Sequence, residues 1–432
     1  MNIKTINKFS YLHLIFAILT ISIYCVGYIF KDYAPGGGPE DFTNFIWRNI
    51  NSFQDDLGNS IINYSKMADA NFPGFYIISS LNPFAYSVSS FHLFSFSLGF
   101  LTFIIFGLIL YEKDNYNNLI TNFSISSLIL ILPFFITRAY WGTSAGLAWF
   151  LLVCLVFYLN KIKVLLIKNE NITIVHIFII CLLSSLLLYV RASYVFFALY
   201  LFLYFLLIIK KNHITLASLI FFSFFSIPGF YLIYIWVNQP LGNINVINVI
   251  SLKNIFLNFP IFTSYFAFYL FPILVIGIKH LNKYIFYKYL KIFSLVFIVY
   301  LVLFMMGKFE YLSNYEFSGG AILKLNYMLI DGNYLLLLIS SMIGCCLLSN
   351  FLKENFLENI ILILPIFLIY GLTDYPFQDY FEPLILILFF SGLLNSSLYK
   401  FYYKNKEAVF YSSFIYFLSF LSFSVYFKNF TD

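Results

Sequence analysis

Charged residues are scarce in this chain. Only 10% of its 432 residues are Asp, Glu, Lys or Arg, whereas 61% are hydrophobic and 22% are aromatic. A soluble domain carries about 25% charged residues, so this chain has too few polar side chains to cover a surface in contact with water. The composition therefore excludes a soluble globular protein and predicts that lipid surrounds most of the chain.

Cysteine and histidine are also scarce, with five residues of each. All five cysteines lie inside apolar blocks, and none is placed to cross-link an outer loop. Neither the cysteines nor the histidines show the spacing of metal ligands. The cysteines are therefore interpreted as small apolar side chains, and the histidines are assigned no role.

Long apolar blocks are abundant. They are about 20 residues long, which is the length that a helix needs to cross the hydrocarbon core, and the alternating pattern of barrel strands is absent. We predict an all-α fold, a polytopic transmembrane bundle of about 13 spans with interfacial helices in the first outer loop. The predicted spans are 9–30, 90–111, 118–137, 143–160, 172–190, 193–209, 214–236, 261–278, 291–306, 334–350, 357–372, 383–399 and 409–427.

The distribution of basic residues orients these spans. Most lysines fall on one face of the membrane, whereas all three arginines and most of the acids fall on the other. Because basic residues mark the cytoplasmic side, we predict a cytoplasmic amino terminus, a periplasmic carboxyl terminus and a location in the bacterial inner membrane. The predicted modules are 1–237, which contains the first outer loop 31–72 and the expected active site, and 238–432, which contains the outer loops 238–260, 307–333 and 373–382.

The first outer loop carries the strongest functional signal, because it combines three consecutive glycines, a predicted amphipathic helix and six acids. We select Glu40, Asp41 and Asp69 as candidate catalytic acids. A carboxylate just outside the bilayer can act as a general base for an acceptor hydroxyl or hold a divalent cation, and the cofactor is otherwise left open. Asp41 also stands where the N-cap of the helix is expected, so both roles stay open for it. Asp55 and Asp56 are interpreted as a helix end and a turn.

The layout of this region resembles that of the GT-C glycosyltransferases, such as the protein mannosyltransferases and the aminoarabinose transferases of lipid A. A first span is followed by an outer loop with an early acid, then by interfacial helices, then by an Asp69-x-x-x-Pro73 stretch that enters an aromatic run. The resemblance covers the amino-terminal half of the chain, and it implies a polytopic enzyme that uses a polyprenyl-phosphate-linked sugar. The order Glu40-Asp41 reverses the acidic pair of the family, and one proline stands where the family motif has two.

Two arginines and a later outer loop complete the candidate site. Arg138 and Arg191 are predicted to reach the same membrane face, where a guanidinium can bind the carrier phosphate through two parallel hydrogen bonds. The alternative role for both is to anchor the chain at the interface. Gln378 and Asp379 lie in an aromatic-rich outer loop and are candidates for binding sugar hydroxyls, with an ordinary interfacial belt as the alternative.

The leading functional prediction is a glycosyltransferase that moves a sugar from a polyprenyl-phosphate-linked donor to a lipid or glycan acceptor. The expected partners are this donor, this acceptor and the membrane, with no nucleic acid. An O-antigen-type polymerase or ligase is one alternative, although its largest outer loop usually comes later in the chain. A transporter or flippase of lipid-linked sugars is the other, and it would carry charges within its spans or paired broken helices.

Overall fold

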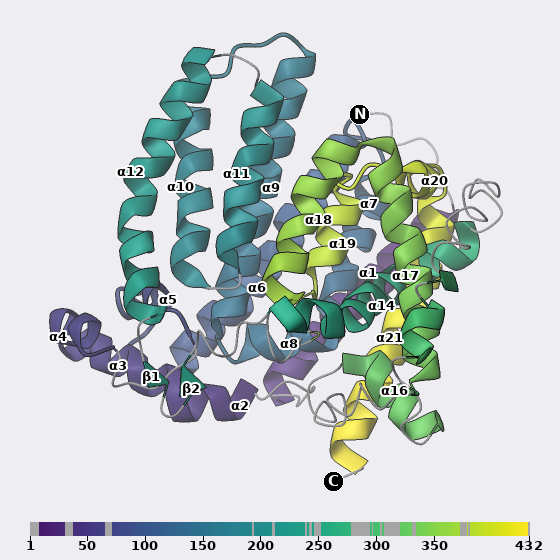
Figure 1. Ribbon diagram of the computed structural model, residues 1–432, viewed down its shortest axis with the longest axis horizontal. Helices are drawn as coiled ribbons and strands as arrows, with labels where there is room; N and C mark the ends of the chain where they lie inside the picture. The colour runs from purple at the N-terminus through teal and green to yellow at the C-terminus, as the bar shows by residue number, and fades with distance from the viewer. Residues whose placement is uncertain are drawn as a thin grey trace. The chain divides into compact units, whose positions relative to one another are not determined.

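The computed structural model is helical (Figure 1). Apart from short connections and one pair of two-residue strands, the residues that it describes form helices. The described residues are 8–30, 38–64, 71–191, 194–209, 212–237, 240–241, 244–245, 252–277, 294–295, 297–302, 305, 320–330, 334–371, 378 and 381–430.

Within these residues, seven helices are long and apolar enough to cross a membrane, or eight if one bent pair of helices is counted as a single span. Three shorter apolar helices accompany them. The chain is therefore a multi-pass helical membrane protein, as its composition predicts. The larger number of spans expected from hydropathy stays a prediction.

The chain divides into two compact units, and each is described by itself. Unit 1 comprises Met1–Ile247 and Phe417–Asp432, and unit 2 comprises Asn248–Tyr416. The elements of unit 1 are α1 (Lys8–Phe30), α2 (Gly38–Asp41), the π-helix η1 (Phe42–Ile46), α3 (Trp47–Asp55), α4 (Leu57–Ile62), α5 (Pro73–Ser80), α6 (Val88–Lys113), α7 (Leu119–Ser127), the 3-10 helix η3 (Leu128–Ile131), α8 (Pro133–Tyr140), α9 (Ser144–Ile167), α10 (Ile174–Val190), α11 (Val195–Ile209), α12 (Asn212–Val237), β1 (Pro240–Leu241) and β2 (Ile244–Asn245).

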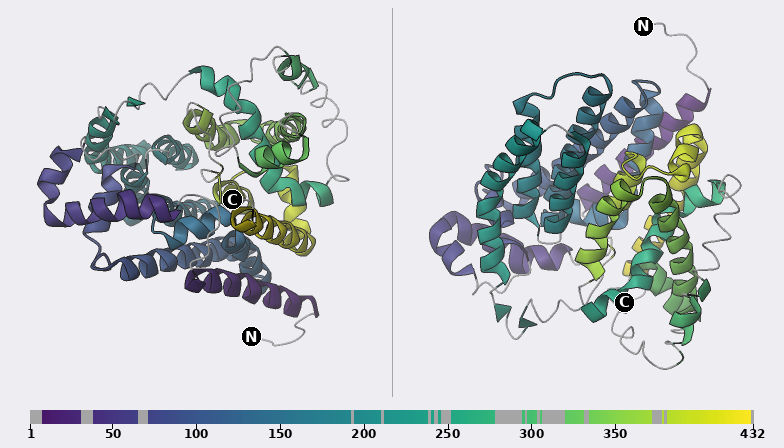
Figure 2. Two further views of the ribbon diagram at one scale, coloured as in Figure 1. Left: turned by 90° about the horizontal axis from the view of Figure 1, so that it is seen from below. Right: turned by 45° about the horizontal axis from the view of Figure 1, so that its top comes forward.

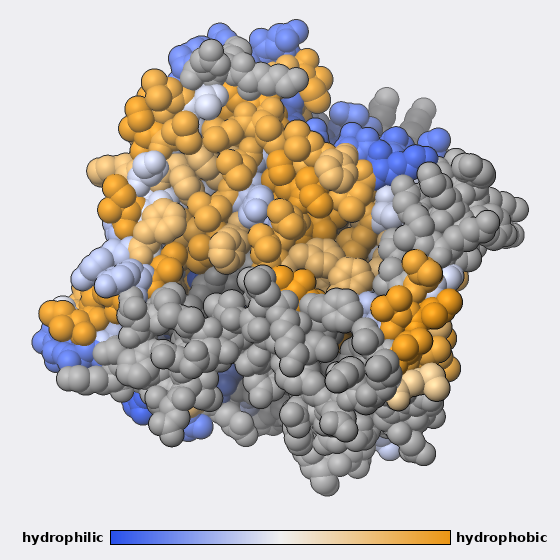
Figure 3. All heavy atoms as spheres, viewed as in Figure 1, coloured by the Kyte–Doolittle hydropathy of each residue, from blue (hydrophilic) through white to orange (hydrophobic). Residues whose placement is uncertain are grey.

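The long helices of unit 1 pack side by side and leave apolar stripes uncovered. Helix α6 packs on α7 and α9, and α10 packs on α9 and α12. The outer side of α12 exposes Leu216, Ile220, Phe224, Ile227 and Tyr231 at helical spacing, each at least 60% exposed. Figure 3 shows the apolar surface over this part of unit 1, with hydrophilic residues at its upper end. A surface of this kind is stable in lipid rather than in water.

The short helices of the first outer loop lie across the direction of the spans. In Figures 1 and 2, α3 and α4 run across the direction of α9 and α10 rather than along it. One face of α3 is apolar, and it buries Ile50 and Phe53 while Asp55 stays exposed. The side chain of Gln54 donates a hydrogen bond of 3.0 Å to the carbonyl of Ala85, which ties α3 to the segment that precedes α6. The amphipathic pattern therefore predicts the helix and its buried apolar face correctly, and its position at the membrane interface stays a prediction.

Unit 2 is built around one tightly packed helix pair. Gly344 of α17 faces the carbonyl of Thr263 on α14, where an added Cβ would lie 1.8 Å from the oxygen. Only glycine permits this approach of the two backbones. The elements of unit 2 are α14 (Leu252–Gly277), α16 (Gly320–Ile330), α17 (Leu335–Glu354), α18 (Phe356–Gly371), α19 (Leu384–Phe390), α20 (Ser397–Lys404) and the start of α21 (Lys406–Phe430), which ends in unit 1.

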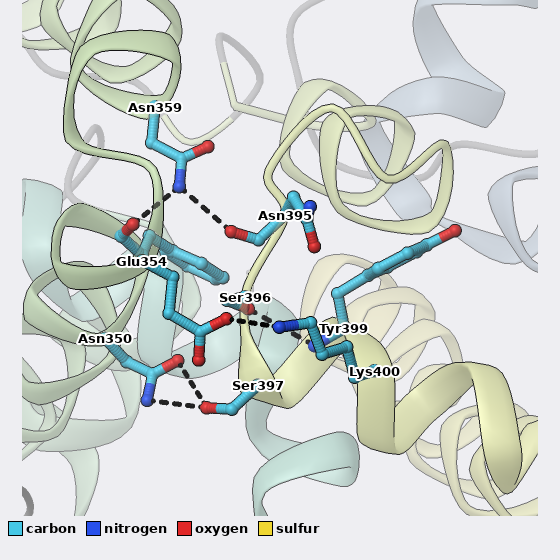
Figure 4. A network of polar contacts seen from close by, with 9 residues as sticks. Asn350, Glu354, Asn359, Asn395, Ser396, Ser397, Tyr399 and Lys400 are labelled. Atoms are coloured by element: carbon cyan, nitrogen blue, oxygen red, sulfur yellow. Dashed lines mark hydrogen bonds and ion pairs between the residues drawn. The ribbon is translucent and has the colours of Figure 1, made fainter. Parts of the chain in front are cut away.

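Polar contacts join three helices at one end of unit 2 (Figure 4). The side chains of Asn350 on α17 and Ser397 on α20 are 3.0 Å apart. Lys400 on α20 lies 2.9 Å from the carboxylate of Glu354 on α17. The side-chain amide of Asn359 on α18 donates a hydrogen bond of 3.0 Å to the carbonyl of Asn395. These contacts fix the ends of the helices and explain why polar residues interrupt the apolar sequence here.

Candidate functional site

An ion pair joins Asp41, at the end of α2, to Arg138 in α8. Nη1 of Arg138 lies 2.7 Å from Oδ2 of Asp41, and the side chains are 17% and 45% exposed. The two residues are 97 positions apart in the sequence. The structure therefore brings together two of the residues that the sequence selects as candidates, one acid and one base.

The N-cap alternative for Asp41 is wrong. The residue is itself in a helical conformation, with φ −57° and ψ −41°, and its side chain makes no capping hydrogen bond. Among the described residues of this loop, Asp56 has a capping role, because its carboxylate accepts a hydrogen bond of 2.9 Å from the backbone N–H of Asn59 at the start of α4. Asp55 ends α3, as predicted, whereas Asp56 is an extended N-cap residue rather than part of a turn.

A sharp bend precedes α8, the short helix that carries Arg138. The sequence predicts one span over 118–137, but the structure bends this segment by 74° between η3 and α8. Leu132 is extended, and the proline that follows it has no backbone N–H and disfavours helix in the residue before it. Protein encloses the segment before the bend, since all of Leu128–Ile131 is buried.

The short helix after the break places its cation favourably. Arg138 lies in the last turn of α8, where the helix dipole favours a positive charge. The chain then turns into α9 through Gly142, whose φ is +61°. A Cβ at Gly142 would lie 2.6 Å from the ring of Phe91 and 2.8 Å from Oγ of Ser95. Glycine is therefore needed at the turn that links the arginine helix to the next span.

Aromatic residues that neighbour Asp41 and Arg138 in the sequence pack on the ring of His92. Phe42, which follows Asp41, lies 4.3 Å from the ring of His92, measured between ring centroids. His92 in turn lies 5.1 Å from the ring of Trp141, three residues after Arg138. His92 is buried, and the sequence analysis assigns it no role. The sequence signal that could have identified it is its position in the second turn of α6.

The end of the first outer loop is fastened to the same region. Oγ of Ser144, at the start of α9, donates to Oδ1 of Asn71 at 3.1 Å. The hydroxyl of Tyr64 donates to the carbonyl of Asn71 at 2.6 Å. Three residues later, Gly74 packs on α10, where an added Cβ would lie 2.1 Å from the carbonyl oxygen of Tyr189. The Pro-Gly sequence that opens α5 thus serves close packing.

Arg191 lies at the end of α10, two residues after Tyr189 and beside α5. It therefore belongs to the same end of unit 1 as Arg138, and its contact with a phosphate stays a prediction. Glu40 lies in α2, where its backbone alone is described, and Asp69 and Asp379 lie outside the described residues. Among the described residues no group of three His, Cys, Asp or Glu side chains is arranged to hold a metal ion.

Gln378 belongs to unit 2, where it takes part in a buried hydrogen-bond chain. The backbone N–H of Ala321 donates to Oε1 of Gln378 at 2.6 Å, so the amide nitrogen of Gln378 must face the hydroxyl of Tyr269, to which it donates at 2.8 Å. The single proton of Tyr269 is then directed to Oε2 of Glu382, at 2.7 Å. Gln378 is predicted to lie in an outer loop, whereas the structure buries it, and sugar binding by Gln378 stays a prediction.

Comparison of the chain with protein-family models, with curated proteins and with solved structures gives no match.

Proposed function

We propose that the chain is a GT-C type glycosyltransferase of the bacterial inner membrane, with about 13 spans and its acidic loop on the periplasmic side. It would move a sugar from a polyprenyl-phosphate-linked donor to a hydroxyl of a lipid or glycan acceptor. The observation that carries this proposal is the pairing of Asp41 with Arg138, because a carboxylate and a guanidinium at one site match the two charges that such a reaction creates.

In this reaction Asp41 accepts the proton of the acceptor hydroxyl. The acceptor oxygen forms a bond to the anomeric carbon of the donor, and the bond from that carbon to the phosphate oxygen breaks. The carrier phosphate leaves with the electron pair, and Arg138 stabilises its negative charge. Arg191 is proposed as a second phosphate contact from the end of α10.

The test compares two acid-to-amide variants in the same loop. Membranes containing Asp41→Asn should transfer sugar from a panel of labelled polyprenyl-phosphate donors about 10²- to 10⁴-fold more slowly than the wild type. Asp55→Asn is the matched control, because Asp55 is an exposed acid at the end of α3, and it should keep full activity. Full transfer activity in Asp41→Asn would sink the assignment.

A transporter or flippase of lipid-linked sugars is the second candidate, and the bend between η3 and α8 favours it. Transporters use discontinuous helices to line their binding sites, and Arg138 lies on the short half of such a broken span. Reconstituted vesicles separate the two functions. A flippase would move a fluorescent lipid-linked sugar across the bilayer without consuming it, whereas a transferase would convert it to product when an acceptor is present.

A further inference from the structure

The two members of the ion pair differ in how firmly they are held. Arg138 is 17% exposed, and its neighbours Thr137 and Ala139 are fully buried. Asp41 is 45% exposed and ends a helix of only four residues. The guanidinium is therefore a fixed group on a packed helix, and the carboxylate approaches it from the more open side.

The backbone beside Asp41 is anchored independently of the ion pair. The next residue, Phe42, is 2% exposed and packs against the ring of His92. It also begins the π-helix η1, a conformation that is rare and recurs at functional sites. The hydroxyl of Thr43 donates to the carbonyl of Pro39, which braces the backbone on both sides of Asp41. The carboxylate can therefore leave Arg138 by rotation of its own side chain.

Nη1 of Arg138 donates a hydrogen bond to one carboxylate oxygen of Asp41. A guanidinium has five N–H donors, and a phosphate offers more charge and more acceptor oxygens than a carboxylate. We propose that the Asp41–Arg138 pair is the resting state of an exchangeable anion site. A phosphate-bearing ligand takes Arg138 from Asp41, and the carboxylate that it releases is then free to accept a proton.

The identity of the ligand, a polyprenyl phosphate, rests on the proposed function. The exchange also predicts a competition that simple phosphate binding does not. Asp41 competes with the ligand for Arg138, so loss of the carboxylate charge should strengthen phosphate binding while it abolishes transfer. A partly exposed ion pair is weak, which sets the expected gain at about two- to fivefold in affinity. Loss of the guanidinium in Arg138→Gln should weaken binding by about tenfold or more.

The experiment measures equilibrium binding of undecaprenyl phosphate to the purified full chain in nanodiscs. Wild type, Asp41→Asn, Arg138→Gln and the control Asp55→Asn are compared after each is checked for the wild-type melting temperature. The exchange predicts that Asp41→Asn binds about two- to fivefold more tightly than the wild type and that Asp55→Asn is unchanged. Asp41→Ala, which also removes the charge, should shift affinity in the same direction.

Two further probes identify the source of the phosphate. Inorganic phosphate tests binding of the free anion, and farnesyl phosphate tests a lipid headgroup with a short chain. Affinity in Asp41→Asn equal to or weaker than that of the wild type for all three probes overturns the exchange. Tighter binding in Asp41→Asn, together with no sugar transfer by the wild type, supports the exchange and overturns the transferase proposal instead.

Discussion

The two polar clusters of the molecule differ in how completely they are enclosed. In unit 1, Asp41 and Arg138 form an ion pair, and their side chains are 45% and 17% exposed. In unit 2, Tyr269 joins Gln378 and Glu382 through hydrogen bonds of 2.8 and 2.7 Å, and at most 1% of each residue is exposed. Water and ions compete for the first cluster, whereas nothing outside the protein replaces a partner in the second.

This difference assigns opposite roles to the two clusters. An exposed ion pair costs little to break, so it can change partners when a ligand binds. A buried hydrogen-bond chain that starts at a fixed backbone N–H has one direction of donation, so each member specifies the orientation of the next. We therefore expect unit 1 to contain the exchangeable site, and we expect the hydrogen bonds in unit 2 to hold the side chain of Gln378 in place between Tyr269 and Ala321.

The largest expected loss of stability comes from Tyr269→Phe. The change removes one hydroxyl and leaves both Oε2 of Glu382 and the amide nitrogen of Gln378 without that partner in a buried environment. Each group that loses its hydrogen bond costs about 1–3 kcal/mol, and the sum should lower the free energy of unfolding by about 2–6 kcal/mol. Reversible unfolding in mixed micelles measures the loss.

The same substitution at an exposed tyrosine provides the control. Tyr86 is 79% exposed, and Tyr86→Phe should change the free energy of unfolding by less than about 0.5 kcal/mol. If Tyr269→Phe is no more destabilising than Tyr86→Phe, the chain of hydrogen bonds in unit 2 does not hold the structure together, and the contrast between the two clusters fails.

A smaller loss is expected where packing, rather than the ion pair, fixes the backbone of unit 1. An added methyl group at Gly74 would lie 2.1 Å from the carbonyl oxygen of Tyr189, which is backbone and cannot rotate away. Gly74→Ala should therefore cost about 1–3 kcal/mol of unfolding free energy. Gly146→Ala is the matched control, because its Cβ would meet no atom closer than 3.7 Å in a helix, and it should be neutral or stabilising. Equal effects of the two variants would contradict this packing account.

Much of this arrangement follows from the sequence. Apolar blocks predict the long apolar helices, and the amphipathic spacing of Ile50 and Phe53 predicts the buried face of α3. Charge asymmetry then selects Asp41 and Arg138, since it places both on one face of the membrane. Their direct contact follows from tertiary structure, because a pattern of charges assigns residues to a membrane face and does not specify which of them meet.

Other features lie beyond such patterns for identifiable reasons. Hydropathy does not report the direction of a helix, so the sequence predicts one straight span across the bend at Leu132. The proline that follows Leu132 is the sequence signal for this bend. His92 contacts Phe42, which is 50 residues away in the sequence, and no local sequence pattern predicts a contact over this distance. Gln378 is polar and lies in a predicted outer loop, so its burial depends on partners in α14 and α16 that the sequence does not identify.

The smallest expected loss of stability comes from removing the charge of Asp41. Asp41→Asn removes one partner of a partly exposed ion pair, so it should lower the free energy of unfolding by less than about 1 kcal/mol. Salt screens an exposed pair, so the difference from the wild type should shrink further as ionic strength rises, whereas the loss in Tyr269→Phe should not. Unfolding of both variants at low and high salt measures this. A loss in Asp41→Asn as large as that in Tyr269→Phe would mean that the ion pair is a structural lock, and an exchange with a phosphate ligand would then be too costly to occur.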